Sequence, residues 1–229
     1  MKSIPVITLD GPSGSGKGTL SRLLAKTLQW HFLDSGLIYR GFAYKVAAAH
    51  IDVENIDKLI MLAKQCNFSF GQEQIGEMPE LNINGETIPA TLLATEHYGE
   101  IASRVGAIVK VRQALVEVQR QFKQAPGLIA DGRDMGTQIF TEADLKLYVT
   151  ASAVERAKRR YQQLKQNAIN VSLEQVQNEI KMRDERDAKR AYAPMVPAKD
   201  AVLIDTTGKT IAAAKALIMS HLQAKGLIS

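Results

Sequence analysis

Residues 11–19 read Gly11-Pro12-Ser13-Gly14-Ser15-Gly16-Lys17-Gly18-Thr19, and this stretch decides the fold. It follows an apolar run, Ile4–Leu9, that predicts a buried strand, and it precedes a segment, Leu20–Leu28, with helical periodicity. A glycine-rich loop in that context, ending in a lysine and a hydroxyl residue, is typical of a phosphate-binding loop. Its backbone N–H groups and the helix N-terminus bind phosphate oxygens, and Lys17 adds a full positive charge. The alternative, a purely structural glycine-rich connection, explains neither the lysine nor the flanking segments. We expect all nine residues to bind a nucleoside triphosphate.

The end of this loop departs from the general pattern, in which Ser or Thr directly follows the lysine and binds Mg²⁺. Gly18 stands at that position and Thr19 comes one residue later. We therefore expect Thr19 to bind magnesium, directly or through water.

The composition limits the class of protein. The 229 residues are 45% hydrophobic, enough for one domain with small appendages, and the net charge of +5 suits polyanionic ligands. The single cysteine, Cys66, excludes an internal disulfide and is expected to be a buried, inert thiol. No apolar run approaches the roughly 18 residues of a membrane helix. Together with the single cysteine, this predicts a cytoplasmic protein. The four histidines show no metal-ligand spacing, so we expect no histidine metal site.

The order of the expected elements predicts an α/β fold with a parallel sheet covered on both faces, because short apolar strands alternate with helices. Beyond the first strand and helix, we expect strands at 31–34, 127–131, 145–150 and 201–205, and helices at 35–49, 56–65, 95–124 (interrupted at Gly106), 153–166, 173–190 and 210–224. The block 68–93 has a different texture and contains Asn84-Gly85, a strong hairpin signal, so we expect a small β-rich insertion there.

Three further clusters carry chemistry. Asp34-Ser35-Gly36, with Tyr39 and Arg40, lies where a strand meets a helix; it could bind a second phosphate or simply cap the helix. Asp131-Gly132-Arg133-Asp134 follows a buried strand at the sheet edge where ligands of α/β proteins bind. There we expect Asp131 to hold Mg²⁺ or its waters and Arg133 to face the ligand, with a surface turn as the alternative.

The third cluster is a pair of arginine-rich helices. Arg156, Arg159 and Arg160 share a face of the first, and the second carries Arg183, Arg186, Asp187 and Arg190 at helical spacing. A solvated, ion-paired face is the alternative. Because arginine suits bidentate phosphate recognition, we expect these helices to close over two nucleotides and neutralise the transferring phosphoryl group.

Together these segments resemble the bacterial cytidylate kinase family, and they run in family order across almost the whole chain. The resemblance rests on residues 10–19, 33–36 with Tyr39 and Arg40, 129–136, 155–160, 183–187 with Arg190, and 204–207. It implies a P-loop nucleoside monophosphate kinase fold with a five-stranded parallel sheet. It also implies one kinase domain, with a core at 1–34, 109–152 and 193–229, a nucleoside monophosphate-binding region with the β-rich insertion at 35–108, and a lid at 153–192.

The resemblance further implies a role for each site residue. Lys17, Arg133, Arg160 and Arg186 would be catalytic, and Arg156, Arg160, Arg186 and Arg190 would form the lid. Ser35, Arg40 and Arg133, with Tyr39 nearby, would bind the CMP phosphate, and Ser103, Arg112 and Asp134 would read the cytosine. Arg183 and Asp187 would hold the sugar, and Arg190 would also reach CMP. Thr19 and Asp131 would hold the Mg²⁺ that accompanies ATP.

The implied activity is transfer of the ATP γ-phosphoryl group to CMP or dCMP by a monomeric enzyme, without a nucleic-acid or membrane partner. One rival is another small-molecule P-loop kinase, acting on AMP or shikimate, against which the Ser103, Arg112 and Asp134 set argues. The other is a nucleotide-driven switch or RNA-binding protein. The sequence lacks the Asn-Lys-x-Asp segment of switch GTPases, and the basic helices carry few interleaved aromatic residues.

Overall fold

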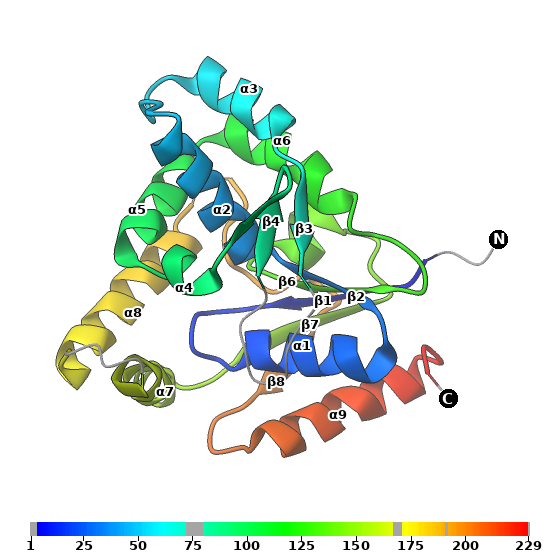
Figure 1. Cartoon of the computed structure of the whole chain (residues 1–229). Coiled ribbons are helices and arrows are strands. Elements are labelled where there is room, and N and C mark those ends of the chain that lie inside the picture. The colour runs from blue at the N-terminus through cyan, green and yellow to red at the C-terminus, as the bar shows by residue number, and fades with distance from the viewer. Residues whose placement is uncertain (1–3, 72–79, 167–170, 191, 229) are drawn as a thin grey trace. The chain divides into compact units, whose positions relative to one another are not determined.

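A computed structural model of the chain describes residues 4–71, 80–166, 171–190 and 192–228 (Figure 1). By its internal contacts the chain divides into two compact units. One comprises Met1–Phe32 and Lys123–Ser229, and the other comprises Leu33–Phe122.

The first unit is built on the predicted parallel sheet. It contains β1 (Val6–Asp10), β6 (Leu128–Asp131), β7 (Leu145–Thr150) and β8 (Val202–Asp205). The fifth strand, β2 (His31–Asp34), begins in this unit and ends in the second, and the strand order is β2-β6-β1-β7-β8. β1 pairs in parallel with both β6 and β7, and β7 pairs in parallel with β8. All five residues of the central strand β1 are buried, as an unbroken apolar run predicts for a strand covered on both faces. The predicted five-stranded α/β architecture is confirmed.

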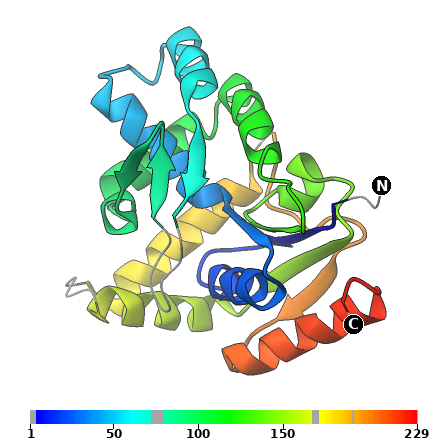
Figure 2. The same cartoon turned by 45° about the vertical axis from the view of Figure 1, so that its right-hand side comes forward.

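Two helices of the first unit cover one face of this sheet. α1 (Lys17–Leu28) and α9 (Ile211–Ala224) lie beside each other against the strands (Figures 1 and 2). Their apolar faces supply Leu20, Leu24, Ile218 and Leu222 to a core with buried residues of β1, β6, β7 and β8.

A second helix pair in this unit has its own small core. α7 (Ala153–Gln166) packs against α8 (Leu173–Ala188) through Ala157, Val176 and Ile180. Ser172 caps α8 in a reciprocal capping box with Gln175, which fixes where this helix begins. Between β6 and β7 lies a five-residue π-helix, η1 (Met135–Ile139).

The second unit combines helices with a small sheet. Its helices are α2 (Ser35–Ala48), α3 (Ile56–Gln65), α4 (Ala90–Leu93), α5 (Glu96–Val105) and α6 (Val109–Arg120). The strands β3 (Phe68–Phe70), β4 (Leu81–Ile83) and β5 (Glu86–Ile88) form an antiparallel sheet, and Asn84 and Gly85 make the β4–β5 turn with φ of 54° and 84°. The predicted hairpin and β-rich insertion are confirmed over the described part of that block; residues 72–79 lie outside it.

The boundaries of several elements differ from the prediction by one or a few residues, and one short α-helix was not predicted. The predicted interruption at Gly106 is confirmed, because the segment forms two helices, α5 and α6, with the break at Gly106–Ile108; α6 ends at Arg120, before the predicted end at 124. The short helix α4 occupies the end of the block expected to be β-rich. Among the helices of the described ranges, none is both long enough and apolar enough to cross a membrane.

Candidate active site

The phosphate loop follows the central strand β1, between the carboxyl ends of β6 and β7. Gly11, Gly14 and Gly16 have φ of 139°, 77° and 87°, a backbone that other residues rarely adopt. The buried Ser15 hydroxyl donates to Pro12 O (3.0 Å) and so braces the loop from within. α1 begins at Lys17, so its N-terminal N–H groups lie directly after the loop, as an anion site requires.

An ion pair closes the end of this loop. Lys17 Nζ lies 3.5 Å from Asp131 Oδ1 at the carboxyl end of β6, and both side chains are largely buried. A Cβ atom on Gly18 would lie only 3.2 Å from Asp131 Oδ2. The glycine at this position therefore leaves room for the Asp131 carboxylate against the loop, which gives a physical reason for the unusual Gly-Lys-Gly-Thr ending.

The turn after β6 is fastened by a residue that the sequence analysis did not assign to the site. The carboxylate of Asp10, at the end of β1, accepts hydrogen bonds from the backbone N–H groups of Met135 and Gly136, both at 2.8 Å. Burial raises the pKa of Asp10 to about 7, although the two N–H groups oppose this, and the charges of Asp134 and Asp131 raise it further. Asp10 thereby fixes the segment that carries Arg133 and Asp134, of which Asp134 is itself buried.

Asp187 gathers arginines from two segments of the first unit. Its carboxylate accepts from Arg133 Nε (3.3 Å) and from Arg190 Nη2, and Arg183 Nε lies 4.0 Å away. The Asp187 side chain is only 6% exposed, so three guanidinium groups surround one buried carboxylate. The structure thus brings together four residues that the sequence analysis assigned to CMP, and Asp187 holds the arginines in place.

The second unit brings together other predicted residues. Arg40 on α2 donates to Leu93 O (2.6 Å) and Thr95 O (3.0 Å), which ties α2 to the α4–α5 connection. The buried Arg112 guanidinium stacks over the Tyr39 ring at 5.2 Å and donates to Gly106 O (3.1 Å). Ser35 is buried in the first turn of α2, which Asp34 caps through Leu37 N. Ser103 is half-buried on α5.

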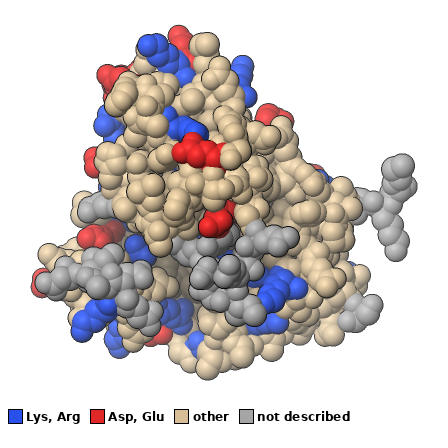
Figure 3. Space-filling view, viewed as in Figure 1, with Lys and Arg blue, Asp and Glu red and all other residues tan. Residues whose placement is uncertain are grey.

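The arginines of the helix pair fall into two groups. Figure 3 shows Lys and Arg side chains gathered around α7. Arg160 is half-buried and Arg186 is exposed, and their contacts with the nucleotides stay predictions. Arg156, by contrast, is buried and donates to protein oxygens, including Ser13 O in the phosphate loop.

Comparison with known proteins identifies the family. The sequence profile described as cytidylate kinase matches residues 7–224. The chain belongs to the cytidylate kinase family. A cytidylate kinase of Coxiella burnetii is 44% identical over 226 residues, which cover 99% of this chain and 95% of the relative. One of Shewanella baltica is 46% identical over 221 residues, covering 96% of both chains. A solved structure of an uncharacterized protein from Eubacterium ventriosum shares the fold alone, with a TM-score of 0.52, 10% identity, and coverage of 96% of this chain and 98% of that one.

ATP-dependent phosphoryl transfer generally uses Mg²⁺, and the residues at the loop end fit that ion. Among the described residues there is no cluster of three or more His, Cys, Asp or Glu side chains that could hold a metal alone. Magnesium that arrives on a nucleotide needs only one or two protein oxygens, because phosphates and water supply the rest. The Asp131 carboxylate beside Gly18, with the Thr19 hydroxyl in the first turn of α1, matches that modest requirement.

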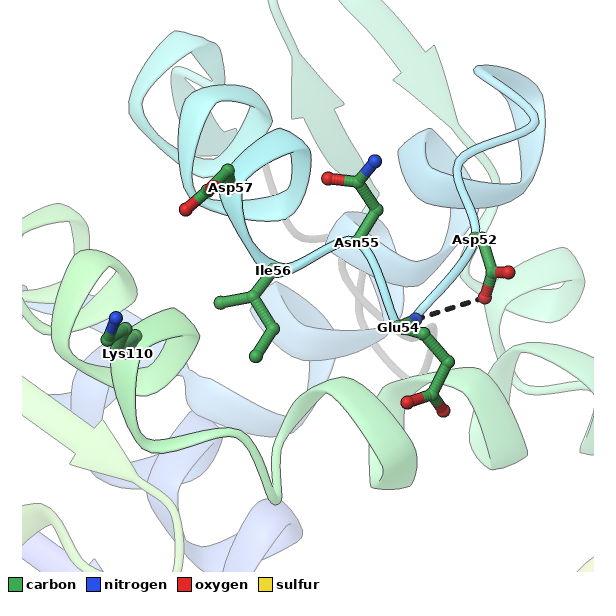
Figure 4. A pocket seen from close by; sticks show the side chains of 6 residues that line it. All are labelled: Asp52, Glu54, Asn55, Ile56, Asp57 and Lys110. Carbon is green, nitrogen blue, oxygen red and sulfur yellow. Dashed lines mark hydrogen bonds between the residues drawn. The ribbon is translucent and has the colours of Figure 1, made fainter.

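A separate hollow of about 610 Å³ lies in the second unit at the start of α3 (Figure 4). It is lined by Asp52, Glu54, Asn55, Ile56, Asp57 and Lys110. Asp52 accepts from Glu54 N within it (3.0 Å), and none of the six residues belongs to the predicted kinase site.

Proposed function

We propose that this chain transfers the γ-phosphoryl group of ATP to CMP or dCMP, giving ADP and CDP or dCDP. The match of the family profile to residues 7–224 carries this conclusion. The glycine loop at the end of the central strand, with Lys17 and Asp131 paired beside it, supports the ATP end of the reaction.

The donor phosphates are assigned to the loop Gly11–Thr19. Backbone N–H groups of the loop and of the first turn of α1 would bind phosphate oxygens, and Lys17 would exchange its contact with Asp131 for the β- and γ-phosphates. Thr19 and Asp131 would hold Mg²⁺, which when bound neutralises phosphate charge.

The acceptor is assigned to two sets of residues, each within its own unit. In the second unit, Ser35, Tyr39 and Arg40 would bind the phosphate side of CMP, and Ser103 and Arg112 would contact cytosine. In the first unit, Arg133 would bind the phosphate, Asp134 would accept from the cytosine amino group, and Arg183, Asp187 and Arg190 would contact the sugar and phosphate. The contacts of Arg112 with Tyr39 and Gly106, and of Asp187 with Arg133, support these assignments because each holds a long side chain in one geometry.

No general base is required. An ionised phosphate oxygen of CMP is already a competent nucleophile, so catalysis consists of alignment and stabilisation of charge on the transferring phosphoryl group. Lys17, Arg133, Arg160 and Arg186 would supply that positive charge. We also expect the enzyme to act as a monomer in the cytoplasm.

The proposal is tested by measuring ADP release with a panel of acceptors: CMP, dCMP, UMP, AMP, shikimate and none. We expect turnover with CMP and dCMP that depends on Mg²⁺ and is abolished by a chelator. Turnover confined to AMP or shikimate would establish a different small-molecule kinase. ADP release that needs no acceptor and rises with RNA would instead establish a nucleotide-driven RNA-binding protein.

A further inference from the structure

The first turn of α7 lies directly against the phosphate loop. A Cβ atom on Gly14 would lie 2.9 Å from the backbone oxygen of Arg156 and 3.0 Å from its Cβ. Gly14 also has a positive φ of 77°, so neither the space nor the backbone geometry admits a side chain there. The loop and α7 are therefore packed backbone to backbone.

The Arg156 side chain reinforces this contact from inside the protein. Its guanidinium donates to Ser13 O in the loop (3.2 Å), to Ala151 O (3.0 Å) and to Asp184 Oδ2 on α8. Only 9% of the side chain is exposed, and the Asp184 carboxylate balances its charge. Arg156 thus joins three segments of the first unit: the phosphate loop, α7 and α8.

A second contact holds the other half of the loop in the same manner. The Thr206 hydroxyl lies 2.8 Å from Ser15 O, and Arg159, one turn beyond Arg156, donates to both the hydroxyl (3.0 Å) and the carbonyl oxygen (2.8 Å) of Thr206. The Ser13 carbonyl is therefore held by Arg156 of α7, and the Ser15 carbonyl by the Thr206 hydroxyl, which Arg159 of α7 positions.

These carbonyl contacts determine where the loop N–H groups point. In a planar trans peptide the C=O of one residue and the N–H of the next point in opposite directions. A Ser13 carbonyl held by Arg156 therefore directs Gly14 N–H away from the Arg156 guanidinium, and a Ser15 carbonyl held by Thr206 directs Gly16 N–H away from the Thr206 hydroxyl. Both N–H groups then point away from the side chains that hold the loop, the orientation expected if they bind an anion.

We infer that Arg156, with Asp184, is a positioning residue for the donor site: it holds the Ser13 carbonyl so that the loop is preformed for ATP before ATP binds. This differs from the role predicted from sequence, in which Arg156 is a lid arginine that meets the nucleotides. The ion pair of Arg156 with Asp184 also links α8 to the loop, so a change in that helix can reach the donor site through it.

The test uses three variants: Arg156→Gln, Asp184→Asn and the double variant that combines these two substitutions. The control is Lys158→Gln, at an exposed residue on the same turn of α7. ATP affinity is measured by calorimetry with Mg²⁺ and without CMP, and amide hydrogen exchange of residues 10–20 is followed without any nucleotide. We expect Arg156→Gln to weaken ATP binding about tenfold and to speed exchange in the loop, as expected for losing a hydrogen bond from a charged donor. The KM for CMP should stay within about twofold, because the acceptor contacts are untouched.

Asp184→Asn is the milder variant, since it keeps the shape of the side chain and should fold even if Arg156→Gln does not. It should change ATP affinity and loop exchange in the same direction by less, and the double variant should be no worse than Arg156→Gln alone, since both act through one pair. The control should match the wild type.

Three outcomes would overturn the inference. A fall in kcat alone, with ATP affinity and loop exchange unchanged, would mean that Arg156 touches the transferring phosphoryl group. Equal losses for ATP and CMP would mean a general structural role, and additive effects of Arg156 and Asp184 would mean that they do not act as a pair. The inference rests on the proposed donor site, which would be refuted if the wild-type protein did not bind ATP. If the wild-type protein binds ATP but releases no ADP with any acceptor of the panel, only the proposed acceptor is refuted.

Discussion

Asp10 gives the sharpest prediction, because its environment couples one proton to the stability of the fold. Its carboxylate is buried at the end of β1, and its pKa is raised to about 7 from an ordinary value of 3.8, chiefly by burial. Between these two pH values the folded protein retains a proton that the unfolded chain has lost. The contribution of Asp10 to the free energy of unfolding is therefore fully present below about pH 4 and is lost as the pH rises through 7.

The size of this loss follows from the two pKa values. Each tenfold change in a proton equilibrium is worth about 1.4 kcal/mol, so a rise from 3.8 to about 7 corresponds to roughly 4 kcal/mol at most. Asp10→Asn removes the titration and keeps the shape, although its amide group cannot accept from both Met135 and Gly136 N–H. The difference in hydrogen bonding between this amide and the protonated carboxyl does not depend on pH and so cancels from a comparison across pH.

Urea unfolding of both proteins at several pH values between 4 and 8 measures the effect. We expect the difference in unfolding free energy, wild type minus Asp10→Asn, to fall by a few kcal/mol between pH 4 and 7 and then to level off. Asp144→Asn is the control, since this exposed carboxylate accepts from Val6 N at the opposite end of β1 and its loss leaves Asp10 in place. Parallel curves for wild type and Asp10→Asn from pH 4 to 8 would refute the reasoning.

Three further predictions concern the chemistry. Lys17→Ala should fold normally, judged by circular dichroism, and lose on the order of 10³-fold or more in turnover, because the substitution removes the positive charge that would contact the donor phosphates. Near-normal turnover would contradict the assignment of the phosphate loop. Asp134→Asn should lower kcat/KM for CMP and shrink the CMP-to-UMP ratio by about 1–3 kcal/mol, because its amide can donate to uracil; equal losses with both nucleotides would leave Asp134 a structural residue. Arg160→Ala and Arg186→Ala should each lower kcat more than they raise the KM for CMP in steady-state assays, and changes confined to KM would make these arginines binding residues only.

The sheet and the loop of this protein were predictable because local patterns determine them. The strand before Gly11 is buried throughout, and alternate residues of the strand Leu145–Thr150 are buried. Asn84-Gly85 makes its turn through a backbone preference of those two residues. The nine-residue loop was recognisable for the same reason, since its glycines mark positions where a side chain does not fit.

Other features depend on contacts between residues far apart in the sequence, and no local sequence pattern predicts them. The π-helix Met135–Ile139 follows a turn that Asp10 fastens from 125 residues away in the sequence. Arg156 shares a helical face with Arg160, and their spacing alone does not separate a buried arginine from one that reaches a ligand. The division of the chain into a core, an acceptor region and a lid stays a prediction.

The second unit is inserted between the two segments of the first unit, and the position of this insertion affects how such proteins can diversify. The backbone of His31, where the chain leaves the first unit, donates to Gly127 O, where the chain has returned to it (2.9 Å), and β2 and β6 are neighbours in the sheet. The sheet therefore closes the ends of the intervening segment whatever its length, and doubling that length would add only about 0.6 kcal/mol of closure entropy. Segments of different size and sequence can be exchanged at this point while the register of the sheet and the phosphate loop stay as they are, so the fold permits the intervening segment to diversify without a change in the loop.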